Sequence, residues 1–225
     1  SYHMNKIKSL FEYRKSLSDW HYDPLVKSTD YQYVGRFEGI SRYIHLIDWP
    51  SMTSGVSFPV DGEKVDENSF PQLQKKDNLS WGYTPEATRK YHLFDNIPDK
   101  FKEIAELTGL SGHTIAILKQ PAGATNPWHY DTHYAVGQKN NLTEDEISKT
   151  TKRYLIMLED WHWGHFVQIG NNVLSQWKAG DIFTWPFGMW HTSANAGIKA
   201  KLTMQVTGTV SENSLHNLSN FKIKV

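Results

Sequence analysis

Short β-rich segments, separated by glycine, proline and asparagine, fill most of the chain from residue 113 to residue 210. They are rich in β-branched and aromatic residues, which is typical of strands. Eight strands at this spacing predict a mainly β fold, either a double-sheet jelly roll or a barrel. The expected strands are His113–Gln120, Trp128–Val136, Arg153–Leu158, His165–Ile169, Val173–Trp177, Asp181–Trp185, Trp190–Ala194 and Lys201–Val210.

The segment before these strands has a different sequence pattern, with helical spacing of apolar residues and long polar stretches. Apolar positions at helical spacing predict helices over Asn5–Ser18 and Pro98–Leu107, the second with proline in its first turn. Tyr31–Arg36 and Arg42–Ile47 are expected to be strands, and the polar, Gly- and Pro-rich stretch Pro50–Pro85 to be mostly loop.

The 225 residues suit one domain, because β-sandwiches and barrels of about 200–250 residues commonly form a single unit. We expect an N-terminal support of helices and long loops over 1–112, a jelly-roll core over 113–210 and a surface tail over 211–225. Within the core, Thr143 and Glu146 have the spacing of a capping box on a short helix.

Charge and cysteine content exclude several classes of function. With 24 basic and 24 acidic side chains, the chain lacks the net charge for bulk nucleic-acid binding. It contains no cysteine, so disulfides, cysteine-based zinc sites and thiol nucleophiles are excluded. No apolar run has the length of a membrane span and no signal-peptide core is evident, so we expect a cytoplasmic protein without a membrane partner.

Candidate metal ligands occur at two separated places in the strand-rich region. His129 and Asp131 are two residues apart, so on a strand they would point to the same face. The same tripeptide occurs at 21–23, ahead of any recognisable sheet, so the pair alone is not specific. After His129, however, a Gly-Asp turn and a hydrophobic strand lead to His191, which can return to the same end of a barrel. Two histidines and one carboxylate with open positions are the ligand set of non-haem Fe(II) oxygenases.

The stretch from Thr114 to Val210 resembles the Fe(II)/2-oxoglutarate-dependent dioxygenases, especially their prolyl hydroxylase and aspartyl/asparaginyl hydroxylase branches. The family pattern of His-x-Asp, a distal histidine about sixty residues later and a basic residue about ten further on is met by His129, Asp131, His191 and Lys201. The resemblance implies a double-stranded β-helix (jelly roll) fold.

The resemblance also implies roles for these residues. His129, Asp131 and His191 would hold Fe(II), and Lys201, with Thr203 beside it, would bind the distal carboxylate of 2-oxoglutarate. Molecular oxygen would take the last position, and the reaction would release succinate and CO2 while hydroxylating a peptide side chain or a small molecule. Arg153 is a second candidate for the carboxylate anchor.

Other interpretations stay open at this point. A cupin-like metalloenzyme without 2-oxoglutarate and a non-enzymatic, aromatic-rich β-sandwich that binds carbohydrate or protein fit the same fold class. His133 could share the face of Asp131 and complete a zinc site. Arg153 could instead cap an edge strand or pair with Glu159 or Asp160.

Tryptophan is concentrated near the candidate ligands. Six of the nine tryptophans lie between Trp128 and Trp190, and these two immediately precede His129 and His191. We hypothesise that the tryptophans enclose a dry pocket, while strand alternation turns Trp128 and Trp190 away from the metal.

Overall fold

Two β-sheets dominate the structure, a computed structural model that describes residues 30–54, 78–89, 91–218 and 221–225. In the described part of the chain, the larger sheet contains, in spatial order, β12 (Phe221–Lys224), β1 (Gln32–Glu38), β9 (Asp181–Thr184), β6 (Thr151–Met157), β11 (Lys201–Thr209), β4 (Ser111–Gln120), β3 (Tyr91–Leu93) and β2 (Thr53–Ser54). The smaller sheet contains β5 (Thr125–His129), β10 (His191–Asn195), β7 (His165–Ile169) and β8 (Asn172–Leu174).

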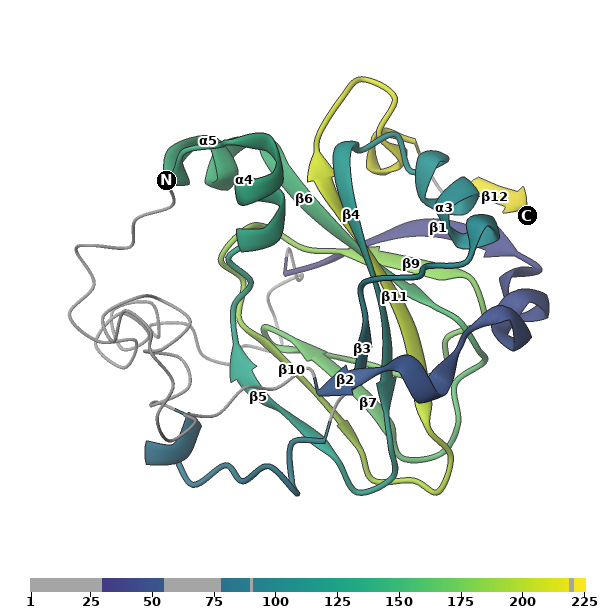
Figure 1. The fold of residues 1–225 in the computed structure, drawn as a ribbon, viewed down its shortest axis with the longest axis vertical. Helices are drawn as coiled ribbons and strands as arrows, with labels where there is room; N and C mark the ends of the chain where they lie inside the picture. The colour runs from purple at the N-terminus through teal and green to yellow at the C-terminus, as the bar shows by residue number, and fades with distance from the viewer. Residues whose placement is uncertain (1–29, 55–77, 90, 219–220) are drawn as a thin grey trace.

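The strand order identifies the fold. The eight strands from β4 to β11 divide into the sets β9-β6-β11-β4 and β5-β10-β7-β8, so consecutive strands repeatedly cross from one sheet to the other. This is the arrangement of a double-stranded β-helix (jelly roll), and it confirms the expected fold class. Figure 1 shows the two sheets facing each other.

Two apolar clusters hold the layers in place. The inner cluster joins Leu155 and Met157 of β6 to Val167 and Ile169 of β7, so it lies between the sheets. The outer cluster covers the opposite face of the larger sheet, where alternate residues of the same strands face helix α3 (Asp99–Glu106). The alternation therefore gives β6 two buried faces, which explains its nearly continuous apolar sequence.

The structure corrects the expected strand at Arg42–Ile47. This segment belongs to the 3-10 helix η1 (Ile40–Leu46), which begins after Gly39 in the left-handed region at φ 92°. Ile40, Tyr43, Ile44 and Ile47 all pack against the outer cluster. Their spacing of three and four residues is helical, so the periodicity favours a helix more than a strand. A second 3-10 turn, η2 (Trp49–Ser51), follows.

The strand expected over Trp128–Val136 is also wrong in its second half. β5 ends at His129, and the chain turns at His133, which has a positive φ of 51°, into helix α4 (Tyr134–Asn140). Helix α5 (Glu144–Thr150) follows with both hydrogen bonds of the predicted capping box between Thr143 and Glu146. The two helices lead into β6 (Figure 1).

The C-terminal segment does not form the expected surface tail. It contains the 3-10 turn η3 (Leu215–Asn217), in which Leu215 is buried, and strand β12, which pairs in parallel with β1. Gly35 permits this pairing, because a Cβ there would lie 2.6 Å from the carbonyl oxygen of Phe221. β12 thus extends the larger sheet beyond the jelly roll.

Some expectations cannot be compared with the structure. The helix expected at 5–18, the second His-x-Asp tripeptide at 21–23 and much of the loop expected at 50–85 lie outside the described residues. Among the described residues, no helix is long and apolar enough to cross a membrane.

Candidate metal centre

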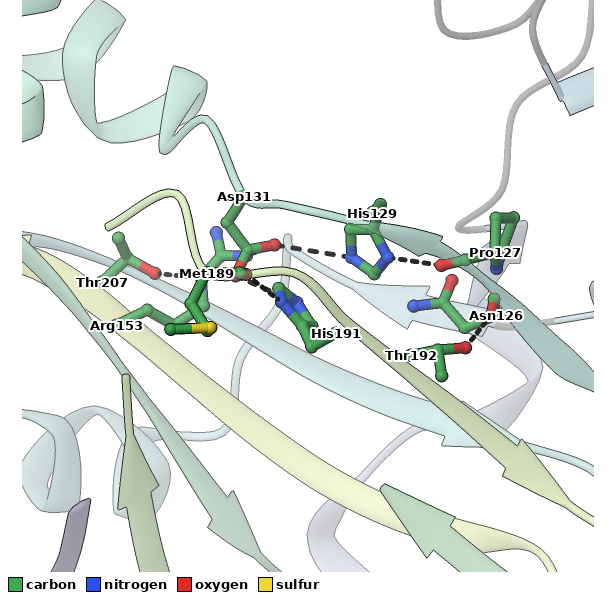
Figure 2. A network of polar contacts seen from close by, with 9 residues as sticks. All are labelled: Asn126, Pro127, His129, Asp131, Arg153, Met189, His191, Thr192 and Thr207. Carbon is green, nitrogen blue, oxygen red and sulfur yellow. Dashed lines mark hydrogen bonds and ion pairs between the residues drawn. The ribbon is translucent and has the colours of Figure 1, made fainter. Parts of the chain in front are cut away.

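His129 and His191 come from adjacent antiparallel strands of the smaller sheet. His129 is the last residue of β5 and His191 the first of β10, and the two are directly opposite each other in the ladder. Their ring centroids are 4.3 Å apart. Thr192 donates a hydrogen bond to the carbonyl of Asn126 at 2.5 Å and ties the two strands together beside the histidines (Figure 2).

The same local hydrogen bond sets the orientation of both imidazole rings. Nδ1 of His129 lies 2.5 Å from the carbonyl oxygen of Pro127, and Nδ1 of His191 lies 2.9 Å from that of Met189. A carbonyl oxygen only accepts hydrogen bonds, so each Nδ1 carries the proton. The neutral rings then present the lone pairs of Nε2 to a common point, as metal-binding histidines do.

Asp131 completes the cluster from the loop between β5 and α4. Its Oδ1 lies 3.6 Å from Nε2 of His129, and its Oδ2 lies 3.4 Å from Nε2 of His191. One ligand atom from each of the three residues falls within 4.8 Å of the others, and this is the group of possible metal ligands found among the described residues. The structure thus brings together the three predicted residues, although Asp131 is not on a strand.

The donor atoms fit a divalent cation. Oδ2 of Asp131 is buried and has no hydrogen-bond partner in the described part of the chain. A buried carboxylate whose two oxygens each face an imidazole lone pair is unfavourable unless a cation lies among them. Two nitrogen donors and one carboxylate form the set that suits non-haem iron, with other coordination positions left open.

Arg153 makes direct contact with this carboxylate. Its Nη1 lies 3.0 Å from Oδ1 of Asp131, and its Nε donates to the hydroxyl of Thr207 at 2.8 Å (Figure 2). Burial by itself raises the pKa of Asp131, but the positive charge of the Arg153 guanidinium acts against it, and this pKa is well below its ordinary value. Asp131 is therefore a carboxylate, ready to bind a cation.

These contacts settle what Arg153 pairs with. Its partners are Asp131 and Thr207, not Glu159 or Asp160, and β6 lies between β9 and β11 inside the sheet, not at its edge. Thr207 was not singled out from the sequence. The two-residue alternation of a strand could have indicated it, because Thr207 continues the series Lys201, Thr203, Gln205 and so lies on the same face of that strand.

His133 lies outside the cluster, which corrects the idea that it shares the face of Asp131. Its Nδ1 is 2.7 Å from the hydroxyl of Thr151, and its ring packs edge-on against Phe187. Burial, reinforced by the charge of Arg153, lowers the pKa of His133 to about 3. It is therefore a neutral, buried histidine at the start of α4.

Lys201 and Thr203 lie on the inner face of β11. The ladder between β11 and β4 is regular from Lys201 to Thr207, which confirms that Lys201, Thr203 and Gln205 share one face. Gln120, opposite Lys201, reaches across to the smaller sheet and contacts Ser193 at 3.3 Å, two residues after His191. The side chain of Lys201 is thus buried between the sheets, 6% exposed, on the His191 side of the barrel.

The tryptophans do not share one location. Trp185, in the inner cluster, packs against His191 with ring centroids 4.7 Å apart. Trp128 and Trp190 stack on each other at 6.3 Å, next to the two histidines in sequence. Trp163, by contrast, is 76% exposed in the loop before β7. Only part of the tryptophan cluster therefore surrounds the site.

Comparison with known proteins gives only distant similarities. No protein-family model matches the chain, and no curated protein matches its sequence. Solved structures similar to it include the cupin domain of Cnp3 from Schizosaccharomyces pombe, which is 14% identical, with 57% of this chain and 69% of that chain covered and a TM-score of 0.35.

Two further structures are similar at the same level. A predicted oxalate decarboxylase from Thermotoga maritima is 14% identical, with 54% of this chain and 80% of that chain covered and a TM-score of 0.33. The nickel complex of the non-heme monooxygenase ThoJ is 17% identical, with 49% of each chain covered and a TM-score of 0.33. The jelly-roll assignment follows from the strand order itself.

Proposed function

We propose that this protein is a non-haem Fe(II)- and 2-oxoglutarate-dependent oxygenase. The observation that carries the proposal is the meeting of His129, Asp131 and His191, with both Nε2 lone pairs and one carboxylate directed to a common point. Bound Fe(II) would supply oxygen activation coupled to oxidative decarboxylation of 2-oxoglutarate, with release of succinate and CO2 and hydroxylation of the substrate.

The charged residues of the site support a dianionic cosubstrate. Asp131 is the carboxylate of the cluster, whereas Arg153 contacts it directly and Lys201 is buried between the sheets. A divalent metal adds to this positive charge and is the largest local charge in such a site. A ligand with two carboxylates would balance it better than a neutral one.

Lys201 is the better candidate for the anchor of the distal carboxylate. Nη1 and Nε of Arg153 are directed to Asp131 and Thr207, beside the metal ligands. Lys201 is buried, next to the buried hydroxyl residue Thr203 on the same face. A lysine ammonium and a hydroxyl together would hold one carboxylate by charge-assisted hydrogen bonds.

Apolar residues of the inner cluster lie between the sheets, next to one of the metal-ligand candidates. Leu155, Met157 and Phe183 belong to this cluster together with Trp185, which packs on His191. These apolar side chains would exclude water from the metal centre, which would strengthen electrostatic contacts and limit side reactions there. We propose a peptide side chain or a small molecule as the substrate.

An anaerobic titration with Fe(II) and 2-oxoglutarate tests the proposal. The chelate of Fe(II) by a 2-oxo acid gives a weak visible charge-transfer band, which we expect with the native protein and not with His191→Ala. Absence of the band from the native protein, or its persistence in His191→Ala, would overturn the proposal. Succinate production with different substrate classes would then identify the substrate.

The same ligand cluster also fits a cupin-like metalloenzyme that uses no cosubstrate. This alternative predicts metal binding that depends on His129, Asp131 and His191, but neither a charge-transfer band nor any role for Lys201 in ligand binding. A non-enzymatic binding module predicts that substitutions in the cluster leave ligand binding unchanged. The charge-transfer band separates the oxygenase from both alternatives, and metal binding that depends on the cluster separates the cupin-like enzyme from the binding module.

A further inference from the structure

We infer that Arg153 is a positioning residue that limits Asp131 to binding the metal through one oxygen. This inference rests on the proposed metal centre but not on its use of 2-oxoglutarate. The inference concerns the orientation of the Asp131 side chain. Asp131 lies in a loop, so regular strand geometry does not fix this orientation. β5 ends at His129, and α4 begins only at Tyr134.

The position of Arg153 is set by the larger sheet. Arg153 on β6 is paired directly with Thr207 on β11, and the Nε–H donates to the threonine hydroxyl at 2.8 Å. This hydrogen bond orients the planar guanidinium, because Nε and the two terminal nitrogens form a rigid fork. The fork then points from the larger sheet toward the loop that carries Asp131 (Figure 2).

Arg153 contacts one of the two carboxylate oxygens. Nη1 lies 3.0 Å from Oδ1, which is also 3.6 Å from Nε2 of His129. Oδ2 lies 3.4 Å from Nε2 of His191 and is buried without a hydrogen-bond partner among the described residues, so Oδ2 is the oxygen that no cation already holds. The guanidinium thus holds one oxygen by a charge-assisted hydrogen bond and leaves the other as the metal donor.

This division of the carboxylate determines how many positions remain open. One donor atom from each of the three residues would leave three positions of a six-coordinate cation for other ligands. If both oxygens of Asp131 bound the metal, one of these positions would be lost. Arg153 would therefore keep room for a two-atom chelate and one further ligand.

Two charge-preserving substitutions test the inference with Co(II) as the probe. Thr207→Val keeps Arg153 but removes the acceptor of Nε–H, and Arg153→Lys keeps the charge but removes the fork. Arg153→Gln removes the charge. Thr209→Val, two residues along β11, is the matched control, since Thr209 faces Ser111 and Thr151 in the ladder.

We expect Thr207→Val and Arg153→Lys to raise the Kd for Co(II) about 10- to 100-fold, the usual cost of losing a partner of a metal ligand. The visible bands of bound Co(II) should also change at saturation, because Oδ1 becomes available as a second donor. Thr209→Val should bind Co(II) as the native protein does.

Two results would overturn the inference. If Arg153 acts only as a counter-charge, both charge-preserving variants will bind Co(II) with native affinity and spectrum, and Arg153→Gln will bind it more tightly. If Arg153 only stabilises the fold, the melting temperature without metal will fall while affinity and spectrum stay native. Circular dichroism identifies the temperature at which every variant is folded, and Co(II) binding is measured there.

Failure of the proposed function is distinguishable from failure of this inference. Co(II) binding that depends on Arg153 and Thr207, without a charge-transfer band on addition of 2-oxoglutarate, would refute the cosubstrate alone. A native band and native Co(II) affinity in both charge-preserving variants would refute only the positioning role. A native protein that binds no Co(II) would refute both.

Discussion

Lys201 and Thr207 project from the same inner face of β11, at the two ends of one row of polar side chains. Thr207 receives the hydrogen bond from Arg153 beside the metal ligands, whereas Lys201 lies opposite Gln120 at the other end of the row. One strand thus contributes to both the proposed positioning of a metal ligand and the proposed binding of a carboxylate.

Replacement of His191 by alanine should abolish tight metal binding. We expect the Kd for Co(II) to rise by more than about 100-fold, beyond the cost of losing an outer partner of a ligand. Isothermal titration calorimetry measures this change. His45→Ala is the matched control, because His45 is exposed on η1. Equal affinities of the two variants would contradict a role for His191 as a ligand.

Replacement of Lys201 by alanine should weaken binding of 2-oxoglutarate while metal affinity is retained. A hydrogen bond to a charged group contributes about 1.5–3 kcal/mol, so the Kd for 2-oxoglutarate should rise about 10- to 100-fold. The charge-transfer band measures it, with the exposed Lys199→Ala as the control. Native affinity in Lys201→Ala would transfer the anchor role to Arg153.

The capping box predicts a contribution of Thr143 to stability. Its hydroxyl accepts a hydrogen bond from the backbone N–H of Glu146 at 3.2 Å. Thr143→Ala should lower the free energy of unfolding by about 1 kcal/mol, as measured by urea denaturation. Thr143→Ser keeps the hydroxyl and should retain most of the stability, so equal losses in the two variants would argue against the cap.

Stability should depend on pH through His165. Burial lowers the pKa of this imidazole below its ordinary value. The unfolded chain therefore takes up a proton near pH 6.5 that the folded protein does not bind, so the free energy of unfolding decreases as the pH falls through and below that value. One such group changes it by at most about 1.4 kcal/mol per pH unit.

His165→Gln should make this acid dependence shallower. Nε2 of His165 donates to the carbonyl of Lys199 at 2.8 Å, and a glutamine amide retains a donor for that carbonyl. Urea denaturation between pH 5 and 7.5 (a range of about one unit or more on each side of the ordinary histidine pKa) measures the slope. The exposed His45→Gln is the control, and identical slopes in the two variants would refute the prediction.

Several elements were predictable because their signal is local. The strands β7 and β11 follow from short β-rich runs bounded by turn residues, and the N-terminus of α5 follows from Thr143 and Glu146. The shared face of Lys201 and Thr203 follows from the two-residue period of a strand. These features depend on residues a few positions apart, so tertiary contacts did not alter them.

Other elements depend on contacts between distant segments. β12 is a strand because it pairs with β1, nearly two hundred residues earlier. The end of β5 depends on the turn at His133, whose ring packs against Phe187 and bonds to Thr151. These partners are distant in the sequence, so no local sequence pattern indicates them. The strand propensity of the residues alone therefore predicted a strand that continues beyond His129, where β5 ends.

The sequence by itself determined the β-rich core and the three candidate ligands, because the strand periodicity and the spacing of the histidines and the aspartate are properties of the linear sequence. The tertiary structure decided that Asp131 lies on a loop, that Arg153 and Thr207 meet beside it, and that His133 turns away. The physical reason is that a carboxylate off the strand is oriented by its partners, and these come from strands of the opposite sheet.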